Sequence, residues 1–386
     1  MNIQEADSRY IAGTYARFPV VITGGKGSLV TDENGKQYID MGTGIAVNTF
    51  GVGDEEWIAA VTAQLNAVQH TSNLYYSKPD VLLAQMLCER TGMQKVFFSN
   101  SGAEANECAI KTARKYAADK KGSEVYTILT LENSFHGRTI TTLAATGQEV
   151  FHKDFTPLTP GFHSVPANDI AALTCAVQKF QPAAILFECV QGEGGVLPLE
   201  PAFVSAMAEL AAQHDILLVV DEVQTGNGRT GTLYSYMQYG IKPDIVTTAK
   251  GLGGGLPIGA TLFGEKTADV LGKGMHGSTF GGNPVCAAGA VNILSRINDD
   301  LLAGVQAKSN DIRRALTGAK GVKNISGLGL MLGIETEKPV AEVLERCREN
   351  GVLAISAKNK VRLLPALNIP DDLLQKAVAV IKQACE

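Results

Sequence analysis

The sequence lacks the features that mark a membrane protein, a secreted protein or a nucleic-acid-binding protein. No apolar run reaches the roughly 20 residues that a membrane-spanning helix needs. Residues 1–7 lack the charged and apolar regions of a signal peptide. The formal net charge is −5, and no basic run is dense enough to bind a phosphate backbone. We therefore expect a cytoplasmic protein that binds neither membranes nor nucleic acid.

Patterns typical of disulfide frameworks and metal sites are missing as well. No two histidines have the spacing of zinc ligands, and no two cysteines form a Cys-x-x-Cys motif. The seven cysteines are odd in number and scattered, at positions 88, 108, 175, 189, 286, 347 and 385. We interpret them as apolar residues in a reducing cytoplasm, and we expect no metal site.

The composition is that of an ordinary globular protein, with 386 residues of which 45% are hydrophobic and 19% charged. This length allows two or three lobes that each bury a core. Alternation of apolar and polar residues predicts a hairpin across 27–40. Two short apolar runs, 216–220 and 245–249, have the length and β-branched content of buried parallel strands. Asp221 follows the first run and Lys250 follows the second.

In open α/β sheets, ligands bind at the carboxyl ends of the strands, where Asp221 and Lys250 are expected to lie. An amine and a carboxylate there suit a pyridine cofactor, because the amine can bond to an aldehyde carbon and the carboxylate can pair with a protonated ring nitrogen. Each residue alone has a plainer interpretation, since a strand-end Asp often caps a helix and a Lys beside glycines can bind phosphate. The glycines follow Lys250, however, whereas in a P-loop they precede the lysine.

Three motifs around these residues resemble the signature of the class III pyridoxal-phosphate aminotransferases, and the resemblance extends over nearly the whole chain. They are Val-Asp-Glu-Val-Gln-Thr-Gly-Asn-Gly-Arg-Thr-Gly at 220–231, Lys-Pro-Asp at 242–244 and Lys-Gly-Leu-Gly-Gly-Gly at 250–255. The resemblance implies fold type I of these transferases, an α/β fold whose mainly parallel central sheet is flanked by helices. The implied parts are a large cofactor-binding domain and a small α+β domain made of an N-terminal arm with its hairpin and a C-terminal lobe. Their expected bounds are 51–300 for the large domain, 1–50 for the arm and 301–386 for the C-terminal lobe.

The same resemblance implies which residues contact the cofactor, pyridoxal 5′-phosphate. Lys250 would hold the cofactor covalently and then carry the proton that moves during transamination. Asp221 would keep the ring nitrogen protonated, so that the ring can accept negative charge. Glu222, Val223 and Gln224 are expected beside the ring, with Gln224 bonding the ring oxygen.

Residues 95–100 predict a strand, and a helix is expected to begin at Gly102 with Ser101 as its N-cap. From the residues alone, this junction is either a phosphate site at a helix N-terminus or a tight strand-to-helix turn. The resemblance makes Gly102 and Ala103 the phosphate cradle.

A further predicted strand, residues 124–131, precedes Phe135 and Arg138. In isolation these side chains would be interpreted as core packing and a solvated charge. The resemblance implies instead that Phe135 stacks on the pyridine ring and that Arg138 binds a substrate carboxylate in a bidentate manner, through two guanidinium nitrogens. His136 is expected only to support the loop.

The strand predicted at 183–190 leads to Glu193, which matches a family carboxylate that pairs with a second substrate arginine and acts as a switch. Arg362, in an Arg-x-x-Pro segment, is the partner that the resemblance implies. It also places Ser278 near the substrate and Thr279 on the cofactor phosphate of a neighbouring subunit, which implies a homodimer. Without the resemblance, Glu193 would be a surface loop residue, and Ser278 and Thr279 would belong to a turn.

The activity that the resemblance implies is transfer of the terminal amino group of N2-acetyl-L-ornithine to 2-oxoglutarate, in arginine biosynthesis. With Glu193 closed on Arg362, only Arg138 would bind the donor's carboxylate; with the pair open, Arg362 would bind that of 2-oxoglutarate. Ornithine and 4-aminobutyrate are the alternative donors. A related aminomutase would need no external 2-oxo acid, and a cofactor-binding regulator would need a helix-turn-helix, for which residues 1–45 are too short.

One position bears on the choice between these donors. In ornithine aminotransferases, a tyrosine in the segment matching 42–48 helps to hold the free α-amino group of ornithine. The matching residue here is Gly44, although Tyr15 matches a second such tyrosine. Glycine removes the hydroxyl and the ring, so a charged ammonium group would lose a partner while an acetyl group would gain room. We therefore expect acetylornithine to be preferred over ornithine.

Overall fold

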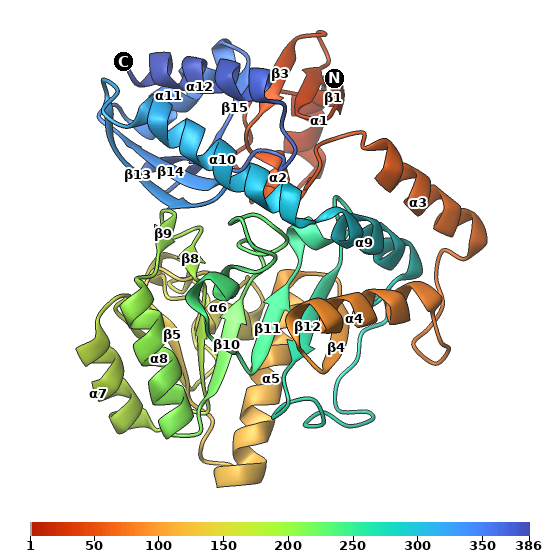
Figure 1. Cartoon of the computed structure of the whole chain (residues 1–386), viewed down its shortest axis with the longest axis vertical. Helices are drawn as coiled ribbons and strands as arrows, with labels where there is room; N and C mark the ends of the chain where they lie inside the picture. Colours follow the sequence, from red (N-terminus) through yellow and green to blue (C-terminus); the bar gives the residue numbers. More distant parts are fainter. Residues whose placement is uncertain (1) are drawn as a thin grey trace.

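The computed structural model describes residues 2–386 and arranges them in a large and a smaller lobe (Figure 1). The large lobe is built on a seven-stranded sheet with the strand order β4-β12-β11-β10-β7-β5-β6. Five of these strands, from β11 to β6, pair in parallel, whereas β12 runs antiparallel to both β11 and β4. The strands are β4 (Lys95–Ser99), β5 (Ile128–Leu131), β6 (Phe162–Val165), β7 (Ala184–Phe187), β10 (Leu217–Asp221), β11 (Ile245–Thr248) and β12 (Gly259–Phe263). The mainly parallel sheet that the sequence predicts is confirmed.

Helices cover both faces of this sheet (Figure 1). The α-helices of the large lobe are α3 (Glu55–Ala67), α4 (Lys78–Thr91), α5 (Gly102–Lys121), α6 (Ile140–Ala145), α7 (Ile170–Phe180), α8 (Pro201–Gln213) and α9 (Pro284–Arg296). Three short 3₁₀ turns are η1 (Glu149–Phe151), η2 (Ser235–Tyr239) and η3 (Lys250–Leu252), and a two-stranded ribbon is formed by β8 (Val190–Gln191) and β9 (Leu197–Pro198).

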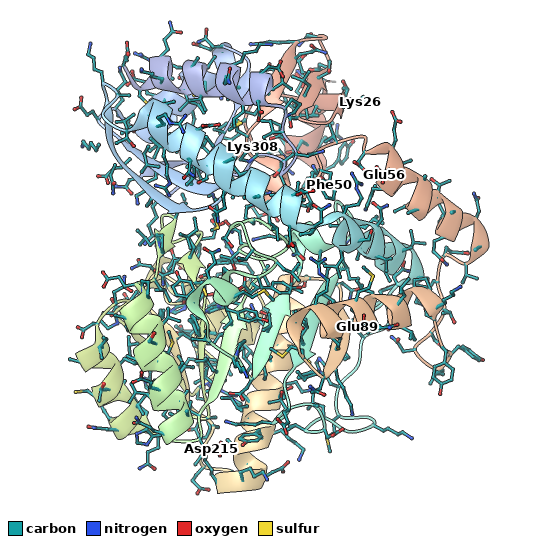
Figure 2. All side chains as sticks on the ribbon, in the orientation of Figure 1. Lys26, Phe50, Glu56, Glu89, Asp215 and Lys308 are labelled. Atoms are coloured by element: carbon teal, nitrogen blue, oxygen red, sulfur yellow. The ribbon has the colours of Figure 1, made fainter. Side chains whose placement is uncertain are left out.

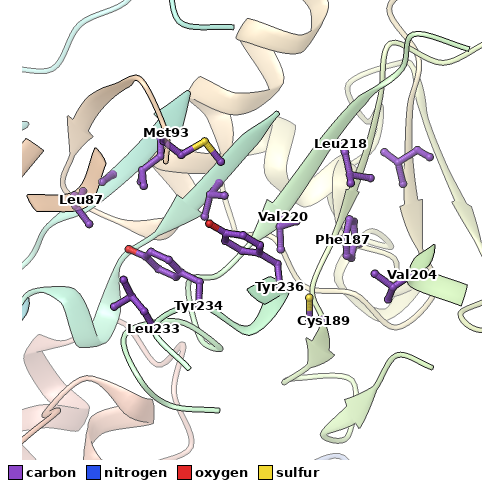
Figure 3. Close-up of a cluster of buried hydrophobic side chains, with 14 of the residues drawn as sticks. Leu87, Met93, Phe187, Cys189, Val204, Leu218, Val220, Leu233, Tyr234 and Tyr236 are labelled. Carbon is purple, nitrogen blue, oxygen red and sulfur yellow. The ribbon is translucent and has the colours of Figure 1, made fainter. Parts of the chain in front are cut away.

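The pleat of β10 explains why two cores form. Successive side chains of a strand point to opposite faces. Leu217 and Val219 accordingly join the core beneath α5, while Leu218 and Val220 join the core on the other face. Figure 3 shows Leu218 and Val220 in this second core, together with Val204 of α8. The sheet is therefore buried on both faces. A site can form at the edge where the parallel strands end.

The smaller lobe joins the two ends of the chain. Strand β15 pairs in parallel with β3, with Val352 opposite Ile39. Ile39 and Met41 are buried in one core with side chains from the last 82 residues of the chain, 305–386. Lys308, labelled in Figure 2, lies 3.7 Å from Asp371 and links the two long helices that cover this core. The α+β unit expected from the N-terminal arm and the C-terminal lobe is confirmed, whereas the bounds at residues 50 and 300 stay a prediction.

The elements of this lobe are two four-stranded sheets and their helices. The first sheet contains β1 (Ile22–Lys26), β2 (Leu29–Asp32), β3 (Gln37–Asp40) and β15 (Val352–Leu353), and the second contains β13 (Val322–Leu328), β14 (Met331–Thr336), β17 (Lys360–Leu363) and β16 (Ile355–Ala357). The helices are α1 (Ile3–Tyr10), α2 (Thr43–Ala46), α10 (Asp299–Leu316), α11 (Val340–Glu349) and α12 (Asp371–Cys385).

Two predicted strands differ from those observed. The strand expected over 124–131 begins only at Ile128, because the preceding residues form turn hydrogen bonds such as Val125 N–H to Gly122 O. The strand expected over 183–190 is interrupted after Phe187, where the chain turns and the Glu188 carboxylate accepts backbone N–H groups from two loops. None of the helices described between residues 2 and 386 combines the length and the hydropathy needed to cross a membrane.

Candidate active site

A cavity of about 490 Å³ lies at the carboxyl edge of the parallel strands. It is lined by residues from the ends of β5, β7, β10 and β11, from the start of α5, and by Val47 from the N-terminal segment. The residues predicted for the site that line the cavity are Gly102, Ala103, Phe135, Arg138, Asp221, Val223, Gln224 and Lys250. Chain segments that lie far apart in the sequence thus meet in one place. This agrees with the rule that ligands bind at the carboxyl ends of parallel strands, here called the strand-end rule.

The start of α5 forms one wall of this cavity. Ser101 caps the helix by accepting a hydrogen bond from the Glu104 N–H at 3.2 Å. The following N–H groups have no partner within the helix and carry its positive end, so they suit a phosphate. A Cβ on Gly102 would lie 2.5 Å from a methyl group of Val223. Glycine therefore allows the helix start to approach the strand end that carries Asp221.

Lys250 lies two residues after β11 and begins the short turn η3. Its φ of 45° is a left-handed conformation that is uncommon for a residue other than glycine. Burial lowers the pKa of the Lys250 amine; the charges of Glu193 and Asp221 oppose this effect, whereas that of Arg362 adds to it. A lowered pKa increases the fraction of neutral amine, which is the form that acts as nucleophile or base.

Asp221 is buried, and its carboxylate contacts three nitrogen atoms: one of a side-chain amide, one of an imidazole ring and one of a backbone N–H group. Its Oδ2 accepts a hydrogen bond from Asn106 Nδ2 at 2.7 Å and lies 2.8 Å from Nδ1 of His136, and its Oδ1 accepts from the Val223 N–H at 3.0 Å. Asn106 is itself fixed, because its Oδ1 accepts a hydrogen bond from the Thr247 hydroxyl at 2.7 Å. These contacts fix the orientation of the carboxylate, as a partner of a protonated ring nitrogen requires.

Phe135 and Arg138 face the cavity from the loop after β5. The Phe135 ring meets that of Phe151 edge to face, with centroids 5.8 Å apart. The Arg138 guanidinium lies 4.4 Å from the Phe151 ring centroid and 5.7 Å from that of Phe135. Two aromatic rings thus hold an exposed guanidinium at the cavity, which is favourable for a cation.

Glu193 and Arg362 form an ion pair next to the cavity. Arg362 Nη1 lies 2.6 Å from Glu193 Oε1, and the arginine side chain is only 3% exposed. Gln224 bridges the pair, because its Oε1 accepts from Arg362 at 3.1 Å and its Nε2 donates to Glu193 at 3.4 Å. Although burial raises the pKa of Glu193, the charge and the hydrogen bond of Arg362 bring it below its ordinary value. The Glu193 carboxyl is therefore ionised at neutral pH.

Besides Glu193 and Arg362, which lie next to the cavity, three predicted residues do not line it. The Glu222 carboxylate points into the protein interior, where it accepts hydrogen bonds from the Ser235 hydroxyl at 2.7 Å and the Tyr236 N–H at 2.8 Å. The hydroxyl of Ser278 accepts from the Gly281 N–H at 2.9 Å and does not line the cavity. Thr279 is exposed outside the cavity of its own chain.

Three further residues at the site were not predicted to act there: Asn106, His136 and Glu188 line the cavity as well. Glu188 directly follows β7, so the strand-end rule that identified Asp221 applies to it too. Asn106 is a polar residue on the buried face of α5, a pattern that signals an internal hydrogen-bond partner. His136 was expected to support the loop, and instead contacts the Asp221 carboxylate.

The family model of the class III aminotransferases matches residues 10–385. The acetylornithine aminotransferase of Haemophilus ducreyi is 50% identical to this chain over 384 residues, which cover 99% of this chain and 98% of that protein. The acetylornithine aminotransferase of Caldanaerobacter subterraneus is 44% identical, with 97% of each chain covered. Fold, site and matches therefore agree, and this chain belongs to the class III aminotransferases.

Solved structures give the same result. The ornithine aminotransferase of Toxoplasma gondii superposes with a TM-score of 0.94 at 33% identity, covering 99% of this chain and 93% of that one, and pyridoxal phosphate partially occupies its active site. The N-acetylornithine aminotransferase of Stenotrophomonas maltophilia superposes with a TM-score of 0.85 at 35% identity, covering 98% and 97%.

The enzyme is a pyridoxal-phosphate-dependent aminotransferase that acts on amino and oxo acids. Its residues fit this cofactor, since a helix start, a buried carboxylate, Phe135 and Lys250 all line one cavity. His136, whose buried Nε2 has no hydrogen-bond partner within residues 2–386, is a further polar residue of the cavity lining.

Proposed function

We propose that this enzyme transfers the terminal amino group of N2-acetyl-L-ornithine to 2-oxoglutarate, giving N-acetyl-L-glutamate 5-semialdehyde and L-glutamate. The names of the relatives at 50% and 44% identity support this donor. The observation that carries the proposal is the closed pair of Glu193 and Arg362 beside an exposed Arg138. One arginine is available to the carboxylate of a long donor, while the other is released only when Glu193 moves away.

Each side chain then has a role in the two half-reactions. Pyridoxal phosphate bound here would supply an electron sink for the carbon that loses its proton. The Lys250 amine would take that proton from the donor carbon that bears the terminal amino group. It would then deliver the proton to the cofactor carbon that is derived from the aldehyde. Asp221 would accept a hydrogen bond from the protonated ring nitrogen, and the α5 N-terminus at Gly102 and Ala103 would bind the phosphate. Arg138 would bind the α-carboxylate of acetylornithine, and Arg362 that of 2-oxoglutarate.

We also propose that the enzyme is a homodimer and that Thr279 reaches the cofactor phosphate of the partner. The loop that bears Thr279 packs against an exposed apolar segment, because Asn73 Nδ2 donates to Gly281 O at 2.9 Å. Leu74 and Tyr76 of this segment are 89% and 101% exposed. Such adjacent apolar side chains favour an interface over open solvent. Light scattering should give twice the chain mass, and Thr279→Ala should weaken phosphate-dependent cofactor binding; a monomer would contradict this part.

The proposed compartment is a reducing cytoplasm, which the seven free cysteines support. Ornithine stays the strongest alternative donor, because the ornithine aminotransferase of Toxoplasma gondii superposes closely.

An amine-donor panel with 2-oxoglutarate tests the proposal. Acetylornithine, ornithine and 4-aminobutyrate are offered in turn, with and without the 2-oxo acid, and glutamate formation is measured. We expect acetylornithine to be the best donor and glutamate to form only with 2-oxoglutarate. Isomerisation of a substrate without any 2-oxo acid would indicate an aminomutase, and a better rate with another donor would overturn the proposed substrate.

A further inference from the structure

Glu188 is a buried carboxylate at the cavity wall with a role in neither proposed half-reaction. It directly follows β7, is 5% exposed, and lines the cavity together with Asp221 and Lys250. Its two oxygens bind different loops. Oε1 accepts a hydrogen bond from the Phe135 N–H at 2.8 Å, and Oε2 accepts from the Gly192 N–H at 3.1 Å.

Each of these two loops carries a residue with a role in the proposed recognition of substrate carboxylates. The first loop continues from Phe135 to Arg138, and the second continues from Gly192 to Glu193. The second loop packs closely on Gln224, because a Cβ on Gly192 would lie 2.5 Å from the Gln224 amide oxygen. A shift of the first loop would therefore move Arg138, which is proposed to bind a substrate carboxylate, and a shift of the second would move Glu193, which covers Arg362.

We propose that Glu188 is a positioning residue that links the Phe135–Arg138 loop to the Gly192–Glu193 loop and so fixes the position of Arg138 relative to the Glu193–Arg362 pair. The link itself is read from the two hydrogen bonds, whereas its consequence for substrates rests on the proposed function. An ionised carboxylate suits this task because both of its oxygens only accept hydrogen bonds. A glutamine amide at Glu188 would place its NH₂ group against one of the two N–H groups, and one contact would be lost.

The charge state of Glu188 gives the link a pH dependence. Burial raises the pKa of the Glu188 carboxyl to about 7, with His136 opposing the rise and Asp221 adding to it. The other titratable groups that it faces are Lys250, which lines the same cavity, and its chain neighbour Cys189. On protonation one oxygen becomes a hydroxyl, which is a weaker hydrogen-bond acceptor for the N–H group of its loop. We expect both substrate KM values to rise as the pH falls below about 7.

The test compares the holoenzyme of wild type, Glu188→Gln and Glu132→Gln. Glu132 is an exposed carboxylate at the end of β5, so its variant removes the same charge close to the same loop. Hydrogen exchange is measured by mass spectrometry with fragmentation to single residues. In Glu188→Gln, the N–H of Phe135 or of Gly192 should exchange about tenfold faster than in wild type, since a lost charge-assisted hydrogen bond has roughly this effect. The Glu132→Gln variant should exchange like wild type.

Steady-state kinetics distinguish a positioning role from a purely structural one, because they measure KM and kcat separately. In Glu188→Gln, KM should rise about tenfold for both the amino donor and 2-oxoglutarate, with kcat within about threefold of wild type. The rise of KM below pH 7 should be present in wild type and Glu132→Gln and absent from Glu188→Gln. Unchanged protection of both N–H groups would overturn the proposal, and so would a fall in kcat with unchanged KM.

Two further comparisons keep the outcome decisive. If Glu188→Gln does not fold, Glu188→Asp retains the charge but is one methylene shorter, and it should likewise lose protection at one of the two loops; full protection at both would refute the link. Exchange does not depend on which donor the enzyme uses. Failure of wild type to use acetylornithine would therefore contradict the proposed function, while the exchange of Phe135 and Gly192 would still decide the role of Glu188.

Discussion

Removal of the Glu193 carboxylate should change which substrates the enzyme prefers. In the structure Glu193 Oε1 lies 2.6 Å from Arg362 Nη1, so a substrate carboxylate reaches this arginine only after the pair opens. A hydrogen bond between charged groups contributes about 1.5–3 kcal/mol. The Glu193 side chain is 30% exposed, which favours the lower end of this range. In Glu193→Ala, glutamate should therefore react with about tenfold higher kcat/KM, because about 1.4 kcal/mol corresponds to a factor of ten.

The acetylornithine half-reaction provides the internal control. Its α-carboxylate is assigned to Arg138, so its kcat/KM should change less than about threefold in the same variant. Single-turnover reactions with each donor, followed by the cofactor absorbance, measure the two values separately. Glu193→Gln should give an intermediate result, since the amide oxygen can still accept from Arg362 without a charge. An unchanged ratio of glutamate to acetylornithine in Glu193→Ala would refute the switch.

The pH dependence of this preference follows from the charge of the pair. Arg362 brings the pKa of Glu193 below its ordinary value, even though burial acts in the opposite direction. A carboxyl with a lowered pKa contributes its pairing energy above its ordinary pKa and loses it only as the pH falls through the folded value. The wild-type preference that depends on Glu193 should therefore stay constant through the neutral range.

Two further predictions concern the chemistry. Borohydride reduction followed by peptide mapping should place the cofactor on Lys250, and label on another lysine would contradict the assignment. Lys250→Ala should still bind the cofactor but lose at least about a hundredfold in turnover, the usual effect of removing a general base. Asp221→Ala should weaken cofactor binding and slow proton transfer; normal turnover at saturating cofactor would refute its role.

The parts of the fold that were predicted correctly follow from local patterns. The runs that became β10 and β11 are apolar and β-branched, and their period and length suffice to place Asp221 and Lys250 at one sheet edge. The Ser101 cap could be predicted for the same reason, because it depends only on neighbouring residues. Local pattern and strand direction thus sufficed to predict that Asp221 and Lys250 lie close together in the site.

Other parts depend on geometry that local patterns do not contain. Side-chain alternation turns Glu222 to the side opposite Asp221, so the two cannot both face the cavity. Arg362 and Glu193 are 169 residues apart, and only the resemblance to the family paired them. Glu188 was not predicted as a site residue because its strand was expected to continue to residue 190. Glu188 would then have lain inside the strand and not at its end.

The most direct test of the proposed substrate compares acetylornithine with ornithine at saturating 2-oxoglutarate. Gly44 is exposed beside the cavity segment that contains Val47, and it supplies no hydroxyl to the α-ammonium group of ornithine. Without that hydroxyl the charged α-ammonium group of ornithine loses a hydrogen-bond partner, whereas an acetylated nitrogen is neutral and needs none. We predict a kcat/KM for N-acetylornithine at least about tenfold above that for ornithine, which requires about 1.4 kcal/mol of differential binding in the transition state. Equal values, or a preference for ornithine or 4-aminobutyrate, would contradict the assignment.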